Sequence, residues 1–332
     1  MRSFSYTVPS SPAEAVAAIA AAGPGAKFLS GGTTLYDLMK QGVEQPTALV
    51  DVSRLAELTV VDTSGSDYLM FGAGARAADV AEDLVVQRDY PVLSESLWRG
   101  ASQQLRNMAR VGANLLQRTR CPYFREREFP CNKREPGSGC AAIGGIDRGN
   151  AVLGTSEFCT ATYPGDWAVA LVAFDAVIDV VGPQGERTVR VADLHLEPGG
   201  SPHREHILDP DELIVRIRVP VTPAGRGSTY LKIRDRESYA FALASAAVGL
   251  TFTDGRVSEC RIALGGVATR PWRARDAEQA LMGRPLTPES ARAAAEAALA
   301  GARAGNYNGF KIKLAKRTVV DALRIAAERA ER

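Results

Sequence analysis

The sequence predicts an α+β protein made of a larger N-terminal unit and a smaller C-terminal α/β unit. Helical and strand patterns alternate over the first sixty residues, as they do in βαβ units. A Pro/Gly/Ser cluster at 222–228 then separates this region from one of alternating strands and Ala-rich helices. We therefore expect two domains, at residues 1–223 and 224–332, joined by a linker near residue 224.

Start and stop signals define the first helix. Ser11 is expected to cap it, with Pro12 at the first position, Glu14 closing a capping box and Gly23 ending it. The segments that follow alternate between strand and helix. Strands are predicted at 27–32, 47–55 and 68–74, and helices at 33–42 and 76–87.

The rest of the chain continues this mixture of helices and strands. A helix and then a loop are predicted at 92–118, a buried helix at 163–176, a hairpin at 176–191 and a strand at 212–220. Beyond the linker, strands are expected at 228–236 and within 242–267. Asp254 and Gly255 predict a type I′ turn between two of these strands. Two or three Ala-rich helices complete the chain.

The composition excludes several classes of protein. The chain has 332 residues, 45% of them hydrophobic and 23% charged, as in ordinary globular proteins. The longest apolar run, at 167–174, is too short to span a membrane. A net charge of +2 predicts no nucleic-acid partner. The Ala-rich start lacks a basic n-region, so we expect no signal peptide that would export the chain by itself.

Three glycine-containing loops are candidate ligand sites. "SGGTT" at 30–34 follows a strand and opens a helix, where a phosphate or diphosphate could bind; the alternative is a tight turn capped by Thr33 or Thr34. "GAGARA" at 72–77 lacks the acidic residue of a dinucleotide fingerprint, so a simple turn is predicted. "VGANLL" at 111–116 is a turn in which Asn114 either caps or contacts a ligand.

The clustering of cysteines is the sharpest anomaly in the composition. Four of the five cysteines lie between residues 121 and 159, in a polar segment without helical or strand periodicity. Their spacing fits neither zinc ribbons nor compact ferredoxin motifs. Disulfides, zinc, a [4Fe–4S] cluster and no metal therefore stay open, although basic neighbours favour the negatively charged cluster. The three histidines, at 195, 203 and 206, lie in a Pro/Gly loop and receive no role.

Several stretches together resemble the FAD-binding middle subunit of the xanthine dehydrogenase family of molybdenum hydroxylases. They include "KFLSGGTTLYDLMK", "VGANLLQRTRCPYF", "CNKREPGSGCAAIGG", "CTATYPGDWAVALVA" and "GNYNGFKIKLAKRTVVDAL". The similarity extends over essentially the whole chain and is closest to flavin subunits of periplasmic aldehyde oxidoreductases, which carry a [4Fe–4S] cluster on an insertion. The resemblance implies an FAD domain of the vanillyl-alcohol oxidase/p-cresol methylhydroxylase type with two subdomains. A cluster-binding insertion is then expected at 118–160, and the C-terminal domain resembles that of carbon monoxide dehydrogenase flavoproteins.

The resemblance also assigns cofactor residues. The FAD diphosphate is expected at Lys27, Phe28, Leu29, Ser30, Gly31, Gly32, Thr33 and Thr34, and the second flavin loop at Gly112, Asn114 and Leu115. Asp166 and Lys232 match further flavin contacts, with Leu213 or Ile214 beside the ring. Cys121, Cys131, Cys140 and Cys159 match the cluster ligands, which leaves Cys260 as a buried strand residue. The second loop departs from the family pattern, because Arg110 replaces a threonine and Ala113 a glycine.

The function implied by the resemblance is electron transfer, with no catalytic acid or base in this chain. A large molybdopterin-binding subunit would oxidise aldehydes to carboxylic acids. Electrons would then pass through two [2Fe–2S] clusters of a small subunit to FAD here and on to an external acceptor. A 4-hydroxybenzoyl-CoA reductase subunit, a stand-alone flavin oxidoreductase and a metal-stapled interaction module are the alternatives. Co-export with a signal-bearing partner predicts a periplasmic location, with the cytoplasm as the alternative.

Overall fold

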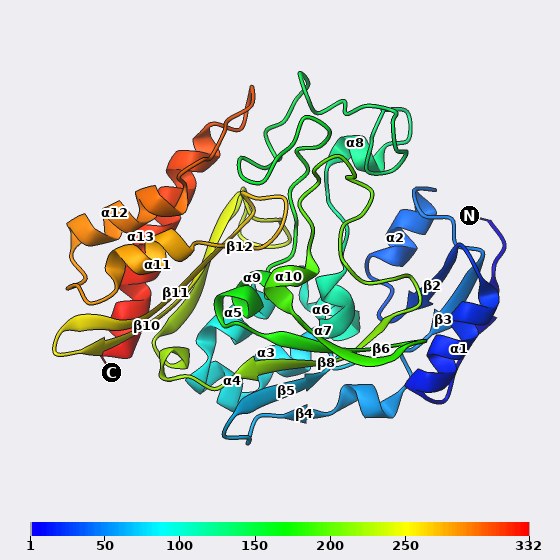
Figure 1. Cartoon of the computed structure of the whole chain (residues 1–332), viewed down its shortest axis with the longest axis horizontal. Helices are drawn as coiled ribbons and strands as arrows, with labels where there is room; N and C mark the ends of the chain where they lie inside the picture. Colours follow the sequence, from blue (N-terminus) through cyan, green and yellow to red (C-terminus); the bar gives the residue numbers. More distant parts are fainter. Residues whose placement is uncertain (1, 332) are drawn as a thin grey trace.

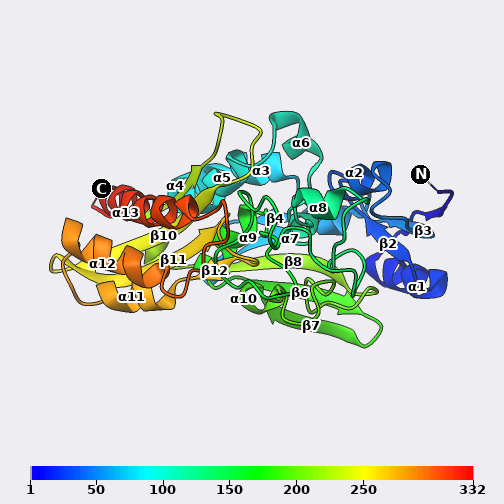
Figure 2. The ribbon, with the colours of Figure 1, turned by 90° about the horizontal axis from the view of Figure 1, so that it is seen from above.

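The computed structural model describes residues 2–331 and contains three sheets with helices packed around them (Figure 1). A small N-terminal sheet lies at one end of the molecule, a five-stranded sheet in the middle and a C-terminal sheet at the other end. Figure 2 shows from above that these parts follow one another along the longest axis. Among residues 2–331 no helix is long and apolar enough to cross a bilayer. The prediction of an α+β protein is confirmed.

The N-terminal sheet is parallel, with the strand order β1-β3-β2. The elements of this region are β1 (Ser5–Thr7), α1 (Pro12–Ala22), β2 (Ala26–Leu29), α2 (Leu35–Lys40), β3 (Ala48–Asp51) and the 3₁₀ helix η1 (Ala56–Thr59). Because α2 connects the parallel strands β2 and β3, the predicted βαβ unit is confirmed.

The first helix shows how closely local signals determine its ends. The Ser11 side chain accepts a hydrogen bond from the Glu14 N–H at 3.2 Å, and Gly23 ends the helix with a φ of 73°. The Glu14 carboxylate, however, accepts from the backbone N–H and the hydroxyl of Ser10, at 2.7 and 2.6 Å. The predicted capping box is therefore wrong in one of its two hydrogen bonds, because the Glu14 carboxylate binds Ser10 instead of the backbone N–H of Ser11.

The central sheet is antiparallel, with the order β4-β5-β8-β6-β7. Its strands are β4 (Val61–Asp62), β5 (Tyr68–Gly72), β6 (Val177–Gly182), β7 (Gly185–Arg190) and β8 (Leu213–Pro220). The helices of this region are α3 (Ala77–Glu82), α4 (Leu84–Asp89), α5 (Pro91–Trp98), α6 (Gln103–Met108), α7 (Val111–Leu115), α9 (Trp167–Ala173) and α10 (Val191–Leu194). The hairpin predicted at 176–191 is confirmed as β6 and β7.

The single helix predicted at 76–87 is wrong, because Asp83 divides it into α3 and α4. The Asp83 carboxylate accepts hydrogen bonds from the N–H groups of Val85 and Val86, both at 2.9 Å. A short acidic side chain that binds nearby backbone N–H groups favours a helix start over a helix interior. Hydrophobic periodicity alone does not reveal that the Asp83 side chain binds these N–H groups and so starts a new helix.

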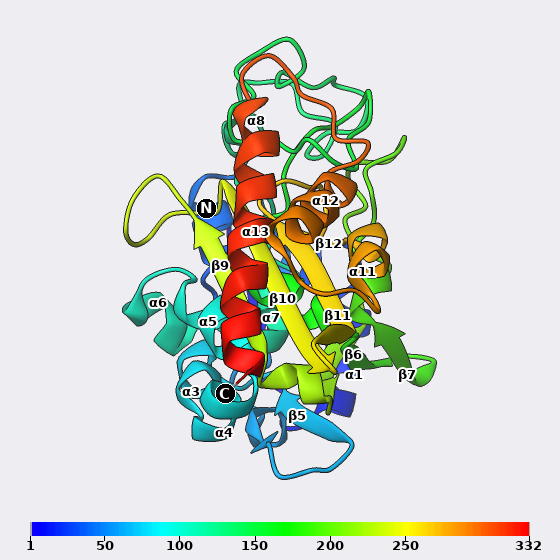
Figure 3. The same ribbon diagram turned by 90° about the vertical axis from the view of Figure 1, so that its left-hand side faces the viewer.

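The C-terminal sheet is antiparallel and is covered by helices on one side. Its order is β12-β11-β10-β9, and α13 runs along β9 and β10 (Figure 3). The elements are β9 (Ser228–Ile233), β10 (Ala244–Thr253), β11 (Arg256–Gly265), β12 (Trp272–Arg273), α11 (Arg275–Leu281), α12 (Pro288–Ala298) and α13 (Phe310–Ala330). Asp254 and Gly255 have φ values of 51° and 72°, as the predicted type I′ turn requires.

The linker predicted at 222–228 is a packed junction. Its 3₁₀ helix η2 (Pro223–Gly225) is partly buried, and a Cβ at Gly225 would lie 2.5 Å from the Asp89 carbonyl oxygen. A Cβ at Gly227 would lie 2.3 Å from the carbonyl oxygen of Leu250. Glycine is therefore present here because two backbones approach closely, and the predicted linker is a segment with close backbone packing.

Helix α9 lies at the centre of the molecule. All seven of its residues are buried, and Trp167 packs edge-on against Phe71 of β5 with ring centroids 5.7 Å apart. The same hydrophobic core includes Tyr230, Ala247 and Ala263 of the C-terminal sheet. One core is thus shared by the central and C-terminal sheets, and α9 lies between them.

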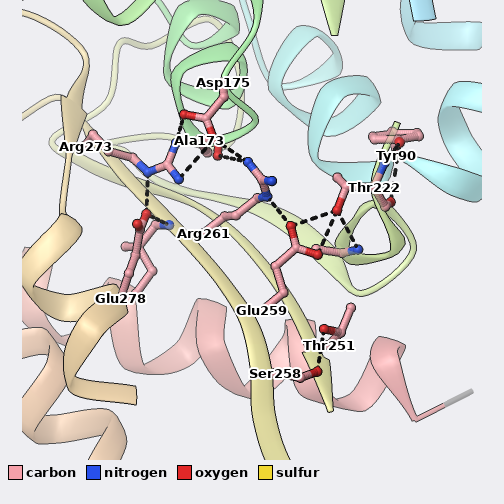
Figure 4. A network of polar contacts seen from close by, with 12 residues as sticks. Tyr90, Ala173, Asp175, Thr222, Thr251, Ser258, Glu259, Arg261, Arg273 and Glu278 are labelled. Atoms are coloured by element: carbon pink, nitrogen blue, oxygen red, sulfur yellow. Dashed lines mark hydrogen bonds and ion pairs between the residues drawn. The ribbon is translucent and has the colours of Figure 1, made fainter. Parts of the chain in front are cut away.

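A polar network at the end of α9 joins the same parts (Figure 4). Asp175 accepts from Arg261 at 2.5 Å and from Arg273 at 2.9 Å. Arg273 also contacts Glu278 of α11, while Arg261 contacts Glu259, which accepts from the Thr222 hydroxyl. These ion pairs connect β11, β12, α11 and the junction at 222–228 to the end of the central helix.

The polar insertion at 118–160 contains one short helix, α8 (Pro122–Arg125), and lies at the top of Figure 1, above the central sheet and its helices. Asp147 accepts from the backbone N–H groups of Asn306 and Tyr307 at 2.9 and 2.7 Å. The Lys311 ammonium donates to the carbonyls of Gly149 and Asn150 at 3.1 and 3.0 Å. The insertion is therefore bound to the segment that leads into α13.

Candidate cofactor site

A cavity of about 1510 Å³ lies where the N-terminal sheet, the central sheet, the insertion and the C-terminal sheet meet. The structure brings together in its wall every residue that the resemblance assigns to the flavin. These residues are Lys27, Phe28, Leu29, Ser30, Gly31, Gly32, Thr33, Thr34, Gly112, Asn114, Leu115, Asp166, Leu213, Ile214 and Lys232. They come from segments up to two hundred positions apart, so only the tertiary fold makes them one site.

The loop at 30–34 follows β2 and is shaped by its glycines. A Cβ at Gly31 would lie 2.1 Å from the Met108 carbonyl oxygen, and Gly32 has a φ of 72°. Both positions therefore require glycine. Thr34 precedes α2 without a capping hydrogen bond from its side chain, so the alternative of a turn capped by Thr34 is not supported.

The second loop is the short helix α7, which rests on the segment at 72–77. Val111 and Gly112 donate their N–H groups to the carbonyls of Ala75 and Ala73, at 3.0 and 2.9 Å. A Cβ at Gly112 would lie 2.5 Å from that of Ala73. Ala113 is helical, so its Cβ introduces no backbone strain at the position where the family has glycine.

The segment at 72–77 forms the predicted turn, but sequence reasoning missed its place in the site. Ala73, Gly74 and Ala77 line the cavity beside α7. Their small side chains permit the close approach of the second loop. The GxGxxA spacing is the signal that could have revealed a close approach to this segment. The group that approaches it is the backbone of α7.

A buried ion pair forms another wall. The Lys232 ammonium lies 2.8 Å from the Asp166 carboxylate, which also accepts from the Tyr230 hydroxyl at 2.7 Å. Lys232 donates to the Arg99 carbonyl at 3.1 Å, so one of its three N–H groups remains for a ligand. Burial, followed by the charge of Asp166, raises the pKa of Tyr230 well above its usual value. The hydroxyl therefore stays protonated and holds the carboxylate in place.

His195 is a cavity residue to which sequence reasoning assigned no role. It is buried, and its Nε2 donates to the Leu115 carbonyl at 2.8 Å, beside the Tyr163 hydroxyl, which donates to the same oxygen at 3.1 Å. Burial lowers the pKa of His195 to about 4, so the ring is neutral near pH 7. The Pro/Gly composition of this segment is typical of a solvated loop, but His195 is buried. The flanking Leu194 and Leu196 are the signal that could have revealed this burial.

These features together fit FAD. The glycines of the two loops are required by close contacts with Met108 and Ala73, and the cavity wall combines aromatic and aliphatic side chains with a buried ion pair. Pockets for cofactors combine such apolar surfaces with a few positioned polar groups. When FAD is bound, the loop at 30–34 and α7 would hold it, while Asp166 and Lys232 would orient it.

The four cysteines of the insertion gather outside this cavity. Cys131 and Cys140 face each other in an antiparallel bridge, and all four thiols are free. Burial raises the pKa of Cys121 to about 11 and also raises that of Cys159, and in both cases the charges of neighbouring cysteines contribute. Deprotonation is thus unfavourable unless a metal binds the thiolates. Cys260, in contrast, lies buried in β11 as expected.

The thiols do not converge on one point. Among residues 2–331 no group of three or more His, Cys, Asp or Glu side chains is placed to hold a single metal ion. In a [4Fe–4S] cluster each thiolate binds a different iron, so such a cluster does not require the sulfurs to meet around one ion. The insertion therefore contains four cysteines, of which Cys121 and Cys159 lie near enough to other cysteines of this set to be affected by their charges, and the assignment of all four to a cluster remains a prediction.

A second ion-pair group fastens the insertion to the cavity. Glu205 lies between Arg118 and Lys133, at 2.5 and 3.0 Å, and Arg118 also contacts Glu44. Burial works against the charge of Glu205, but the two cations hold its pKa below the usual value. Because Arg118, Lys133, Glu205 and Glu44 all line the cavity, the cysteine segment is anchored directly beside the flavin loops.

Comparisons with known proteins agree with this geometry. Residues 2–222 match the family model "FAD binding domain in molybdopterin dehydrogenase", and residues 229–326 match "CO dehydrogenase flavoprotein C-terminal domain". The aldehyde oxidoreductase FAD-binding subunit PaoB of Escherichia coli (strain K12) is 47% identical over 99% of this chain and 100% of its own length.

Two solved structures have the same fold over their whole length. Carbon monoxide dehydrogenase from Hydrogenophaga pseudoflava superposes with a TM-score of 0.78 at 30% identity, covering 99% of this chain and 98% of that one. Reconstituted CO dehydrogenase from Oligotropha carboxidovorans superposes with a TM-score of 0.79 at 25% identity, covering 99% of both chains.

The contact of Gly31 with Met108 leads to a first prediction. Gly31→Ala should weaken FAD binding by about tenfold or more, because the new Cβ must displace the backbone that shapes the loop. Flavin content per purified chain and FAD titration of the apoprotein measure this. Gly200→Ala is the control, since a Cβ there meets open space. Equal flavin content in the two variants would contradict the role of Gly31.

The buried neutral His195 leads to a prediction about pH. Its pKa is about 4 in the folded chain and about 6.5 in the unfolded chain. Between pH 4 and pH 6.5 the unfolded chain therefore binds more protons at this histidine than the folded chain does. Stability from this group is present above pH 6.5 and is lost as the pH falls toward 4, by up to about 3 kcal/mol. His195→Asn should flatten this part of the pH profile of unfolding, whereas His203→Asn, at an exposed position, should not.

Proposed function

This chain belongs to the family of FAD-binding medium subunits of molybdenum hydroxylases, and we propose that within it the chain is the flavin subunit of an aldehyde oxidoreductase. The membership rests on two family models that together match nearly the whole chain. The aldehyde substrate is supported by the 47% identity with a subunit of an aldehyde oxidoreductase over its full length. The single cavity that collects all fifteen flavin residues carries the functional part of the proposal.

In this function the protein binds and positions FAD, and the flavin supplies the electron-transfer chemistry. The loop at 30–34 and α7 hold the cofactor with backbone groups at close range. The Asp166–Lys232 pair, fixed by Tyr230 and Arg99, keeps its polar atoms in one orientation. His195 and Tyr163 hold the Leu115 carbonyl, so that α7 cannot rotate. No residue of the chain is required as an acid or a base.

Partner subunits complete the proposed enzyme. The substrate would react at a molybdopterin-containing large subunit, and electrons would reach this chain through [2Fe–2S] clusters of a small subunit. An external acceptor would then take them from the flavin. The relatives named above support this arrangement, because they are FAD-binding subunits or parts of CO dehydrogenases.

Purification of the chain from its native host tests the proposal. Larger and smaller subunits should be recovered with it, with molybdopterin and iron in the complex and aldehyde-dependent reduction of a dye. A chain that oxidises a substrate without partners would instead be a stand-alone flavin enzyme. A chain recovered without flavin would overturn the proposal, and a complete complex inactive with aldehydes would overturn the aldehyde substrate.

The four cysteines of the insertion are proposed to bind a [4Fe–4S] cluster. Four free thiols lie in one segment, Cys131 and Cys140 face each other, and Lys133 lies near enough to Cys159 to favour its thiolate. The apolar core around these residues is small: Cys131 packs with Leu38 and Phe124, and Val152 and Leu153 of the insertion belong to the core of the C-terminal domain instead. The cluster would add metal bonds to this small core.

Cys131→Ser tests this cluster. The variant should lose most of its iron and acid-labile sulfide, together with the visible absorption of the cluster, because a hydroxyl is a poor ligand for iron in place of a thiolate. Its FAD content should not change, since none of the four cysteines lines the cavity. Cys260→Ala is the control and should keep its iron. Unchanged iron in Cys131→Ser would remove this residue from the ligand set.

The periplasmic location is likewise a proposal that follows from the similarity to periplasmic aldehyde oxidoreductases. Folded complexes of this kind would leave the cytoplasm together, on the signal of a partner. Cell fractionation before and after removal of the partner's signal would test it, and a chain found in the cytoplasm in both cases would overturn it.

A further inference from the structure

Two arginines of the cavity wall are buried or half-buried and form no ion pair with an acidic residue among residues 2–331. Arg106 of α6 is only 8% exposed, and its Nη1 donates to the Gly100 carbonyl at 2.8 Å. Its guanidinium lies 4.7 Å from the centre of the Trp98 ring, and its Nε is buried without a hydrogen-bond partner. A guanidinium is costly to bury unless an anion accepts its N–H groups, so this charge is poised for a ligand.

Arg110 repeats this arrangement at the start of α7. Its Nη1 donates to the Gly74 carbonyl at 3.0 Å, while its Nε is buried and unpartnered. Burial, followed by the like charge of Arg76, lowers the pKa of Arg110. No carboxylate forms an ion pair with it within the described part of the chain.

The other arginines that line the cavity are different. Arg118 contacts Glu44 and Glu205, and both Arg120 and Arg125 contact Asp37, so their charges are balanced within the protein. Arg204 and Arg236 form no ion pair but are exposed to solvent. The uncompensated positive charge that is shielded from solvent therefore belongs to Arg106 and Arg110.

The glycine loop lies against the backbone that joins these two arginines. The space for a Cβ at Gly31 is occupied by the Met108 carbonyl at 2.1 Å and by the Ala109 Cα at 3.2 Å. Met108 is the last residue of α6 and Ala109 follows it, with Arg106 and Arg110 on either side of this pair in the chain. The backbone of the loop at 30–34 and two unpaired guanidiniums thus share one part of the cavity.

We propose that Arg106 and Arg110 bind the diphosphate of FAD and supply the charge that balances it. The proposal rests on the proposed flavin function. Of the parts of FAD, only the diphosphate is anionic at neutral pH, because the isoalloxazine ring, the ribityl chain and adenosine are neutral. Guanidinium groups bind phosphate oxygens with paired, charge-assisted hydrogen bonds, and a carbonyl engages only Nη1 of each arginine, which leaves Nη2 as a donor for a ligand.

The test compares FAD binding to the full-length apoprotein in matched glutamine variants. Arg110→Gln and Arg106→Gln keep an N–H donor for the Gly74 and Gly100 carbonyls but remove the charge. Each should weaken FAD binding about tenfold and make it less sensitive to salt. Inorganic pyrophosphate should compete with FAD in the wild type and about tenfold less effectively in the variants. Thermal unfolding of each apoprotein checks that it is folded.

Arg76→Gln is the matched control, because Arg76 is exposed, lies opposite Arg110 in a β-bridge and does not line the cavity. Its FAD affinity should stay within about twofold of the wild type. Wild-type affinity in both cavity variants would overturn the inference. So would weaker FAD binding with unchanged pyrophosphate competition, since the arginines would then act on another part of the flavin. A wild-type chain that binds no FAD would instead overturn the proposed function.

Discussion

Helix α9 joins the two halves of the molecule, because it is buried along its whole length and is flanked by an aspartate at each end. Asp166, just before the helix, binds Lys232 and Tyr230 of β9. Asp175, just after it, binds Arg261 and Arg273 of the C-terminal sheet. The Asp166–Lys232 pair is buried, and a buried pair adds little net stability compared with apolar side chains, although breaking it leaves a costly unpaired charge. The Asp175 side chain is partly exposed and adds a second contact. Together the two contacts orient the C-terminal sheet against the central core.

The cavity is a consequence of that orientation. Lys232 reaches the flavin wall only because β9 is held against the start of α9, and His195 reaches it because its loop packs beside Tyr163. The insertion closes another side through Arg118, Glu205 and Lys133, while its far end is bound to the segment before α13. Movement of either domain would thus alter the cavity.

Most of the fold could be predicted where local signals and periodicity agree. The ends of α1, the hairpin of β6 and β7 and the type I′ turn at Asp254 follow from residues within a few positions of each other. Predictions failed where a distant contact decides the outcome. The composition of 222–228 predicted a linker but not the contacts that require its glycines, because Asp89 lies against Gly225 and Leu250 against Gly227. Likewise, the Pro/Gly context of His195 hid its burial.

The sequence by itself determined most helices and strands, the glycine loops, the grouping of the cysteines and the similarity to molybdenum hydroxylase flavin subunits, since these depend on residue type and short spacing. Only the tertiary structure decided which charges are balanced. Arg118 and Arg106 are alike in the sequence, yet Arg118 lies between two glutamates and Arg106 is buried without one. The free energy of a buried charge depends on its neighbours in space, and these come from segments that the sequence leaves far apart.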